Sequence, residues 1–253
     1  MIYGLYLSAS GIMTNSYRQD VIANNLANSE TVGFKRDLAQ FQERRTASHE
    51  PGNAGKFSDP LLDKIGGGIL ATATQVDTRQ GDLENTGNTL DVAIQGDGFF
   101  TVAKNGVKHL TRDGNFMLNR QGDLILTTDQ TQKVLDDKGK PIRLTSGGNV
   151  QIDQQGQITQ NGAAIAKLAM VDVDDHSLFS KQGGTLLAYP EAAGMRPATG
   201  VVYSGFQERS NVDPTTELSE LMDTQRQLEA NANMLKDQDT MLQKLVNDVG
   251  KIS

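Results

Sequence analysis

"DPTTELSELMDTQRQLEANANMLKDQDTMLQKLVNDV" (residues 213–249) is the longest uninterrupted helical pattern in the sequence and decides the fold. Apolar residues recur along it every three or four positions, as in a helix with one buried side. Asp213 followed by Pro214 is typical of a helix start, because aspartate caps the first turn and proline is tolerated at the first helical position. From Thr215 to Val249 there is neither proline nor glycine. The sequence therefore predicts a long helix here.

The contact line expected along this helix steps by three and four residues through about four heptads. It consists of Leu218, Leu221, Gln225, Leu228, Ala232, Leu235, Asp239, Leu242, Val246 and Val249. Gln225 and Asp239 make the line rather polar for a self-sufficient two-helix coiled coil. We therefore expect helices from other copies of the chain to complete it. The alternative is an intramolecular helical hairpin with no role in assembly.

Residues 2 to 30 carry a second helical pattern. Its apolar line, interrupted by Ser16 and Gln19, is formed by Ile2, Leu5, Ala9, Ile12, Ala23 and Leu26. Neither amphipathic segment can bury its apolar side alone. The simplest solution pairs the two segments in a coiled-coil-like arrangement and leaves the middle of the chain as a long insertion.

The middle of the chain changes from a helical period to short strands separated by turn residues every 8 to 12 positions. Two apolar runs flank Asn105-Gly106 within residues 98–111, and Asn161-Gly162 follows the same pattern. Asn-Gly is the strongest short hairpin signal because both residues accept a positive φ. We therefore expect an α+β protein with paired terminal helices and a large inserted antiparallel all-β domain.

Three regions follow from this organisation. Residues 1–36 and 211–253 are predicted to form a discontinuous helical domain, and residues 66–210 the antiparallel β domain. Residues 37–65 are predicted to be a linker or extended segment, because prolines and glycines are frequent from residue 46 onward.

Composition excludes several classes of function. The net charge of −7 and the pI near 5.0 argue against nucleic acid as the main partner. The chain has no cysteine, which excludes disulfides and thiolate sites. No run approaches the roughly 20 apolar residues of a membrane helix. No lysine or arginine precedes Arg18, so we expect no signal peptide of the general secretion pathway.

No pattern of catalytic or cofactor-binding residues stands out. His49, His109 and His176 lie in different regions, and no GxSxG motif surrounds any serine. The acidic run "VDVDDHS" (171–177) has no EF-hand spacing and is better explained as the exposed end of a strand. Gly96 and Gly98 are expected to form a turn between strands rather than a phosphate loop. We therefore expect neither an enzyme nor a cofactor or metal site.

Four motifs carry a resemblance to a known family. They are "NNLANSETVGFKR" (24–36), "GNTLDVAIQGDGFFTV" (87–102), "TRDGNF" (111–116) and "SGFQERSNVDPTTELSELMDTQRQLEANANMLKDQDTMLQKL" (204–245). In type and order they resemble the axial family of the bacterial flagellum, the rod and hook proteins of the basal body. The resemblance is collinear and covers nearly the whole chain.

The resemblance implies a subunit that the flagellar type III apparatus exports unfolded and that polymerises helically into a hollow shaft, the rod that crosses the periplasm. Its partners would be other copies of itself, other axial rod and hook proteins and the export apparatus, without membrane insertion. The length and the run "KVLDDKGKPIRL" (133–144) favour a rod subunit where proximal and distal rod join. The exact place in the rod stays open, as do a hook-type axial protein and a rod-assembly scaffold or chaperone as alternatives.

The resemblance also implies an axial assembly interface built from the terminal segments. Its expected residues are Leu5, Ile12, Asn24, Asn25, Leu26, Asn28, Gly33, Phe34, Leu218, Leu221, Leu228, Leu235, Leu242 and Val246. Asparagine is a mediocre helix former, so Asn24, Asn25 and Asn28 are expected to bridge neighbouring helices and set their register. The alternative for these three is a solvated helix end. Gly33 is expected to end the first helix as its C′ residue, with Phe34 in the accompanying apolar contact.

Overall fold

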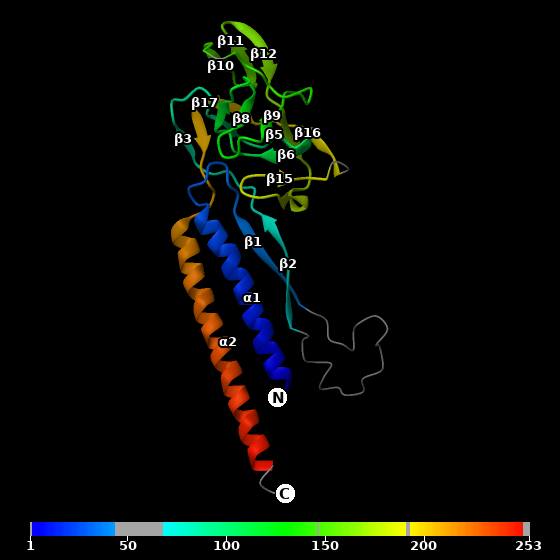
Figure 1. Cartoon of the computed structure of the whole chain (residues 1–253), viewed down its shortest axis with the longest axis vertical. Helices are drawn as coiled ribbons and strands as arrows, with labels where there is room; N and C mark the ends of the chain where they lie inside the picture. The colour runs from blue at the N-terminus through cyan, green and yellow to red at the C-terminus, as the bar shows by residue number, and fades with distance from the viewer. Residues whose placement is uncertain (1, 44–67, 146, 191–192, 250–253) are drawn as a thin grey trace. The chain divides into compact units, whose positions relative to one another are not determined.

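The computed structural model describes residues 2–43, 68–145, 147–190 and 193–249. The chain divides into two compact units, which are described separately below. The helical unit comprises residues 1–26, 38–74 and 214–253, and the β unit comprises residues 27–37 and 75–213. Figure 1 shows the elements of both units in chain order by colour.

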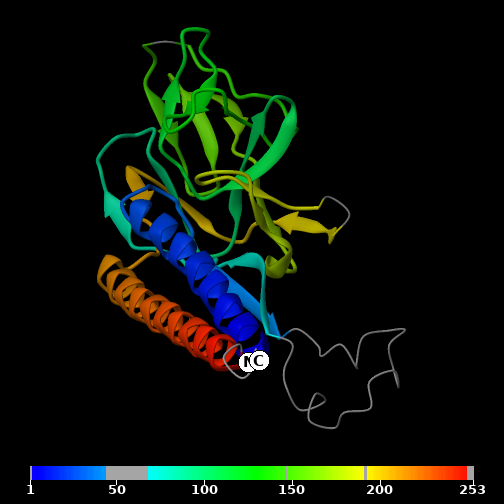
Figure 2. The ribbon, with the colours of Figure 1, turned by 60° about the horizontal axis from the view of Figure 1, so that its bottom comes forward.

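The helical unit contains one helix from each end of the chain. Helix α1 spans Ile2–Ala27 and helix α2 spans Pro214–Val249. The two helices lie side by side in both ribbon views (Figures 1 and 2). The predicted α+β fold with contacting terminal helices is thus confirmed, and α2 begins at the predicted proline.

Strands β1 (Asp37–Glu43) and β2 (Ile69–Val76) form a two-stranded sheet that packs on α1. Ser10 Oγ donates to the carbonyl of Ile69, and Tyr17 Oη donates to the carbonyl of Thr72. A two-stranded sheet is marginal by itself, so these contacts with the helix support it. Residues 37–43 of the predicted linker are therefore strand, whereas the rest of it, 44–65, lies outside the described residues.

The β unit is built from short strands and one 3₁₀ turn. Its elements are β3 (Leu83–Asn85), β4 (Val92–Gln95), β5 (Phe99–Lys104), β6 (Val107–Thr111), β7 (Phe116–Leu118), β8 (Leu124–Leu126), β9 (Lys133–Val134), β10 (Val150–Ile152), β11 (Gln157–Gln160), β12 (Ala163–Lys167), β13 (Met170–Val173), η3 (His176–Leu178), β14 (Ser180–Lys181), β15 (Leu187–Ala188), β16 (Met195–Pro197), β17 (Val201–Ser204) and β18 (Phe206–Glu208).

The largest sheet of this unit orders its strands β14-β15-β6-β5-β9-β8-β7, with β13 also paired to β5 and β16 to β13. Strands β10, β11 and β12 form a separate antiparallel sheet. Strand β17 pairs antiparallel with β4, and β18 pairs antiparallel with β3. These last two pairs join the first strands of the insertion to its last strands. The β unit can therefore be inserted between two helices that are far apart in sequence.

Neighbouring residues on β5 fill two different apolar clusters, because successive side chains of a strand point to opposite faces. Phe100 packs in the larger cluster with residues such as Phe116, at a ring-centroid distance of 5.3 Å. Phe99 packs in the second cluster against Phe179, at a centroid distance of 5.0 Å. Both β5 rings are fully buried, so this strand lies at the centre of the unit.

The two Asn-Gly hairpins predicted from the sequence are confirmed. Asn105 and Gly106 join β5 to β6 with φ values of 52° and 82°, and Asn161 and Gly162 join β11 to β12 with the same values. Gly96 and Gly98 lie between β4 and β5, where both have positive φ, as expected for a turn. Within the described residues, no helix is long and apolar enough to cross a membrane.

Candidate functional site: the helix pair and a buried ion cluster

Three contacts fix how α1 and α2 pair. The Asn25 side-chain amide donates to the Glu217 carboxylate at 3.4 Å. A Cβ on Gly11 would lie 3.0 Å from Asn231 Nδ2, and a Cβ on Gly4 would lie 2.9 Å from Gln238 Nε2. A step of seven residues toward the N-terminus of α1 therefore corresponds to a step of seven residues toward the C-terminus of α2. The helices are antiparallel and keep one register over their whole contact.

The seam between the helices is half polar. Leu221, Leu228, Leu235 and Leu242, all predicted, are half-buried along it. Alternating with them are Glu217, Thr224, Asn231 and Gln238, of which Glu217 and Thr224 are fully buried. Gly4 and Gly11 leave room for the two amide side chains opposite them. Polar groups at such positions favour one register over others at some expense of stability.

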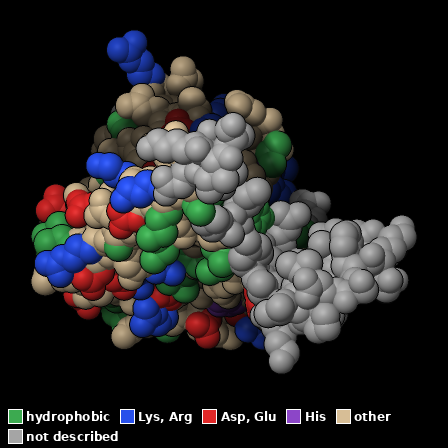
Figure 3. Space-filling model, turned by 90° about the horizontal axis from the view of Figure 1, so that it is seen from below, with side chains coloured by type: hydrophobic (Ala, Val, Ile, Leu, Met, Phe, Trp, Pro, Cys, Tyr) green, Lys and Arg blue, Asp and Glu red, His purple; other side chains and the backbone are tan. Residues whose placement is uncertain are grey.

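Part of the contact line predicted for α2 does not face α1. The positions 218, 225, 232, 239 and 246 lie one residue beyond those that meet α1, and all five are exposed. Leu218 is 48% exposed and Val246 is 70% exposed. The apolar pattern alone selected these residues, whereas the structure buries Glu217 and Thr224 instead. Figure 3 shows hydrophobic side chains that reach the surface among acidic and basic ones.

The three asparagines expected to act together have different surroundings. Asn25 is buried on the side of α1 that meets α2, which fits its predicted bridging role. Asn24 is exposed. Asn28 lies just beyond the helix and accepts hydrogen bonds in the following turn, from the Thr31 backbone to its carbonyl and from the Thr31 hydroxyl to its Oδ1. Leu5, Ile12 and Leu26 are half-buried on α1.

The prediction that Gly33 ends the first helix is wrong, because α1 ends at Ala27. Gly33 does have a positive φ of 67°, but for another reason. Its N–H donates to the carbonyl of Glu208 at 2.8 Å, and any Cβ would collide with the backbone of Arg112 and Asp113. Phe34, fully buried in the β unit, lies under the Lys181 ammonium at 3.6 Å from the ring centroid.

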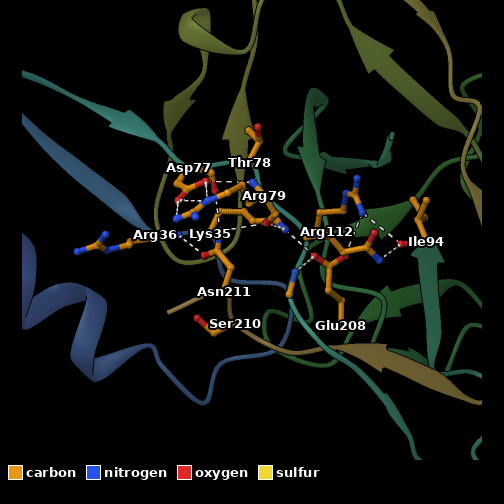
Figure 4. Close-up of polar contacts among 12 residues, drawn as sticks. Lys35, Arg36, Asp77, Thr78, Arg79, Ile94, Arg112, Glu208, Ser210 and Asn211 are labelled. Atoms are coloured by element: carbon orange, nitrogen blue, oxygen red, sulfur yellow. Dashed lines mark hydrogen bonds and ion pairs between the residues drawn. The ribbon is translucent and has the colours of Figure 1, made fainter. Parts of the chain in front are cut away.

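Gly33 and Phe34 lead into a buried ion cluster in the β unit, centred on the carboxylate of Glu208 (Figure 4). Glu208 Oε1 accepts from Lys35 Nζ at 2.5 Å and from the Gly81 N–H at 3.0 Å. Glu208 Oε2 accepts from Arg112 Nη1 at 3.0 Å. All three charged side chains are almost completely inaccessible. The cluster thus holds two cations around one carboxylate.

Backbone carbonyls supply the remaining partners of the two cations. Lys35 Nζ donates to the carbonyl of Arg79 at 2.7 Å. Arg112 donates to the carbonyls of Ile94 and Gly96 and lies over the ring of Phe99. Burial lowers the pKa of Lys35 from its ordinary value, and the carboxylate of Glu208 opposes this effect. Arg112 Nε is buried without a hydrogen-bond partner, so the pairing is extensive but not complete. Buried charges are tolerated only where most of their polar atoms are paired in this way.

Asn211 joins the same region to the segment that follows α1. Its Oδ1 accepts from the Arg36 N–H at 2.7 Å, and its Nδ2 donates to the carbonyls of Asp77 and Arg79 (Figure 4). Lys181 Nζ donates to the carbonyl of Lys35 and to the carboxylate of Asp37. Hydrogen bonds therefore join the chain segments 33–37 and 208–211 to each other and to the strands of the β unit. The two segments are far apart in sequence.

The cluster was missed at the level of sequence, although its residues lie within the motifs quoted there. Lys35 belongs to "GFKR", Arg112 to "TRDGNF", and Glu208 to "FQERSN". The available signal was that each of the three motifs carries a charged side chain within two positions of a glycine or an aromatic residue. The acidic run 171–177 also has a structural use, since Arg196 pairs with the buried Asp172 and Asp175 caps η3. The described residues hold no cluster of histidine and carboxylate groups suited to a metal ion.

Comparison with known proteins gives the family. Residues 203–248 match the C-terminal region of flagellar basal body rod FlgEFG proteins, residues 5–35 match flagella basal body rod proteins, and residues 93–160 match the D1 domain of flagellar hook protein FlgE/F/G. The basal-body rod protein FlgF of Caulobacter vibrioides is 34% identical over 98% of both chains. The chain belongs to the flagellar basal-body rod protein family.

Two FlgG rod proteins are similar to this chain over nearly its whole length as well. The one from Buchnera aphidicola is 33% identical over 97% of this chain and 99% of its own. The one from Bacillus subtilis is 32% identical over 98% of this chain and 99% of its own. The family expected from the motifs is thus confirmed. This rod protein is a structural subunit of the flagellar basal-body rod and not an enzyme, and its family implies assembly with other rod subunits.

The family matches coincide with the site. Lys35 lies in the N-terminal matched region, Arg112 in the hook-type D1 region and Glu208 in the C-terminal region. The rod protein therefore joins its three matched regions through one buried carboxylate. The helix seam uses the first and the last of these regions.

Proposed function

We propose that this rod protein assembles helically through its terminal helices, with other copies of itself and with other axial rod and hook proteins, to form the drive shaft of the flagellum. The observation that carries the proposal is the half-polar seam between α1 and α2, together with the large apolar residues left exposed on the same helices. A pair that buries Glu217 and Thr224 but exposes Leu218 and Val246 has apolar surface to offer to further helices.

The proposed assembly surface contains the residues expected from the family resemblance. On α2 these are the half-buried leucines and the exposed Leu218 and Val246. On α1 they are Leu5, Ile12, Leu26 and the asparagines at 24 and 25. We assign Asn28, Gly33 and Phe34 to the segment that follows the helix. The bonds from Thr31 to Asn28 and the contacts of Gly33 and Phe34 described above lie within the β unit. We propose that the helical unit is the assembly module and that the β unit lies on the outside of the shaft.

Export through the flagellar type III apparatus is part of the same proposal. A subunit that must pass a narrow channel benefits from ends that fold late, since helices are marginal in water without tertiary support. The half-polar seam provides only modest support within one chain, so the ends complete their folding on assembly. The run 133–144 is our reason for proposing a place where proximal and distal rod join.

Electron microscopy of purified basal bodies tests the proposal directly. The rod protein, labelled with a small tag in the β12 hairpin at Asn161-Gly162, is produced in cells that lack the untagged chain. We expect label on the outside of the shaft, in the part of the rod where its proximal and distal segments join. Label confined to the cytoplasmic export machinery, or absent from purified basal bodies of motile cells, would contradict assembly into the shaft.

A further inference from the structure

The sequence contains two Asn-Gly pairs, and both form turns of the β unit with the same backbone conformation. Asn105-Gly106 joins β5 to β6, and Asn161-Gly162 joins β11 to β12. In each turn the asparagine has a φ of 52° and the glycine a φ of 82°. All four residues are exposed, and a Cβ on either glycine would have nothing within 4 Å. The two turns therefore differ mainly in the contacts that their asparagine side chains make.

An asparagine followed by glycine can react with its own main chain. The glycine nitrogen gives up its proton and attacks the side-chain carbonyl carbon of the asparagine. A C–N bond forms, the bond from that carbon to the side-chain nitrogen breaks, and ammonia leaves with the proton. One water molecule then opens the resulting five-membered succinimide to isoaspartate or aspartate. Such an intramolecular attack depends on how freely the two atoms approach each other, and glycine leaves the most freedom because it has no Cβ.

Asn161 is tied to the residue that precedes β10. Its N–H donates to the carbonyl of Asn149 at 3.0 Å, and its Oδ1 accepts from the Asn149 N–H, also at 3.0 Å. Asn149 is itself held in place, because the next residue, Val150, pairs with Gln160. Closure of the succinimide ring requires rotation about both the main-chain and the side-chain bonds of the asparagine. The two hydrogen bonds to Asn149 oppose both rotations.

Asn105 has no such restraint. Within the described residues its side chain makes no hydrogen bond. The β5–β6 ladder ends at the pair of Lys104 with Val107, so Asn105 and Gly106 lie beyond it. Lys104 donates to Asp129 at 2.9 Å, and Lys108 is exposed. The side chain at 105 is therefore free to rotate toward the Gly106 nitrogen.

We propose that Asn105 is a site of spontaneous deamidation in the folded protein and that Asn161 is protected by its two bonds to Asn149. The product carries a new negative charge at the tip of the β5–β6 hairpin, between Lys104 and Lys108 in sequence. Where the ring opens to isoaspartate, the main chain of this two-residue turn also gains a methylene group. The modification thus changes both the charge and the turn geometry of an exposed hairpin, and it is independent of the assembly function proposed above.

Peptide mapping by mass spectrometry tests the assignment on the full-length protein, aged in buffer and sampled over time. Deamidation is quantified separately at positions 105 and 161. We expect position 105 to react at least fivefold faster than position 161 in the folded protein. In a matched sample aged in guanidinium chloride, the two rates should agree within twofold, because the bonds to Asn149 are absent from the unfolded chain. Equal rates in the folded protein, no reaction at either position, or a difference that persists in the denaturant would each overturn the proposal.

Gly106→Ala and Gly162→Ala provide the second measurement. Both glycines have open space around the Cβ position, so hydrogen exchange of the strand amides should show that each variant keeps its β unit. The added methyl group hinders attack by the nitrogen that carries it. We expect Gly106→Ala to slow deamidation at position 105 at least fivefold, and Gly162→Ala to leave that rate unchanged. An unchanged rate at position 105 in Gly106→Ala would contradict the succinimide route.

Discussion

Lys35 and Glu208 are 173 positions apart in sequence, yet their side chains form a buried ion pair with Nζ and Oε1 2.5 Å apart. One partner follows the first helix and the other precedes the second. Arg112 adds a second buried cation to the same carboxylate. The pair therefore holds the two connections of the insertion at one point of the β unit, and its loss has predictable effects.

Glu208→Gln preserves the shape of the side chain but leaves Lys35 and Arg112 without a buried counter-charge. We expect the free energy of unfolding of the β unit to fall by about 3–5 kcal/mol, measured by hydrogen exchange of the β5 and β6 amides in the full chain. The matched control is Glu84→Gln, which removes the same charge from an exposed pair with Arg209 at 3.8 Å. That control should lose less than about 1 kcal/mol.

The loss of folding stability in Glu208→Gln should depend on pH. Burial already lowers the pKa of Lys35, and removing the carboxylate that opposes this effect lowers it further. A lysine whose folded-state pKa lies below its unfolded value makes stability rise with pH between those two values. We therefore expect the variant to recover stability relative to the unmodified chain as the pH rises toward 10. An equal deficit at pH 7 and pH 10 would mean that Lys35 stays charged without Glu208.

Gly33→Ala tests the close approach of the segment after α1 to the backbone at Arg112 and Asp113. The added methyl group meets that backbone and also requires a strained positive φ. Gly106→Ala is the control, because Gly106 has a positive φ of 82° and nothing within 4 Å of its Cβ position. The control should lose about 1–2 kcal/mol from strain alone. In the same hydrogen-exchange measurement, the free energy of unfolding should fall at least twice as far in Gly33→Ala as in the control. Equal losses in the two variants would show that the segment 33–36 moves to accommodate the methyl group.

Asp113 and Asp129 should give opposite pH effects. Burial raises the pKa of Asp113 above 3.8, although Thr128 and the Asn115 N–H donate to its carboxylate. Its ionisation in the folded state therefore opposes folding, and its contribution to stability falls as the pH rises from the unfolded pKa through the folded one. Asp113→Asn should thus gain stability relative to the unmodified chain between pH 4 and pH 7.

Hydrogen bonds from Lys104 and its neighbours hold the pKa of Asp129 well below its usual range. Its stabilising contribution is present above pH 3.8 and is lost as the pH falls through the folded-state pKa. Asp129→Asn should therefore lose stability at pH 7 and lose progressively less below pH 4. Urea denaturation of the two variants across this pH range is the measurement. Slopes of the same sign in both variants would contradict the assignment of their environments.

Leu228→Asp places a charge in the half-buried seam between α1 and α2. An unpaired charge is strongly disfavoured there, so we expect loss of incorporation into rods while the β-strand amides keep their protection. Gln227→Asp, one residue earlier and exposed, adds the same charge outside the seam and should incorporate normally. In dilute monomer, brief proteolysis should trim both helices and leave a resistant fragment near residues 75–213. Helices as resistant as that fragment would show that one chain suffices to stabilise the pair.

Local patterns were sufficient for those elements whose conformation depends on neighbouring residues. Pro214 and the long run without glycine or proline predicted α2 correctly, and the Asn-Gly pairs at 105 and 161 predicted their hairpins, because positive φ is a property of these residues themselves. The α+β class followed from the change of period along the chain. Family motifs then identified the rod family without any knowledge of contacts.

The tertiary structure alone decided which side of each helix meets its partner. Leu218 and Glu217 are adjacent, and hydrophobicity favoured Leu218 for the seam, but Glu217 is buried because Asn25 of the other helix donates to it. Gly33 suggested a helix end from the sequence. In the structure, glycine is needed there because the backbone at residue 33 lies against the backbone of residues 112 and 113, with no room for a Cβ. The ion cluster of Lys35, Arg112 and Glu208 was beyond any local pattern, because a charge can be buried only where distant parts of the chain supply its partners.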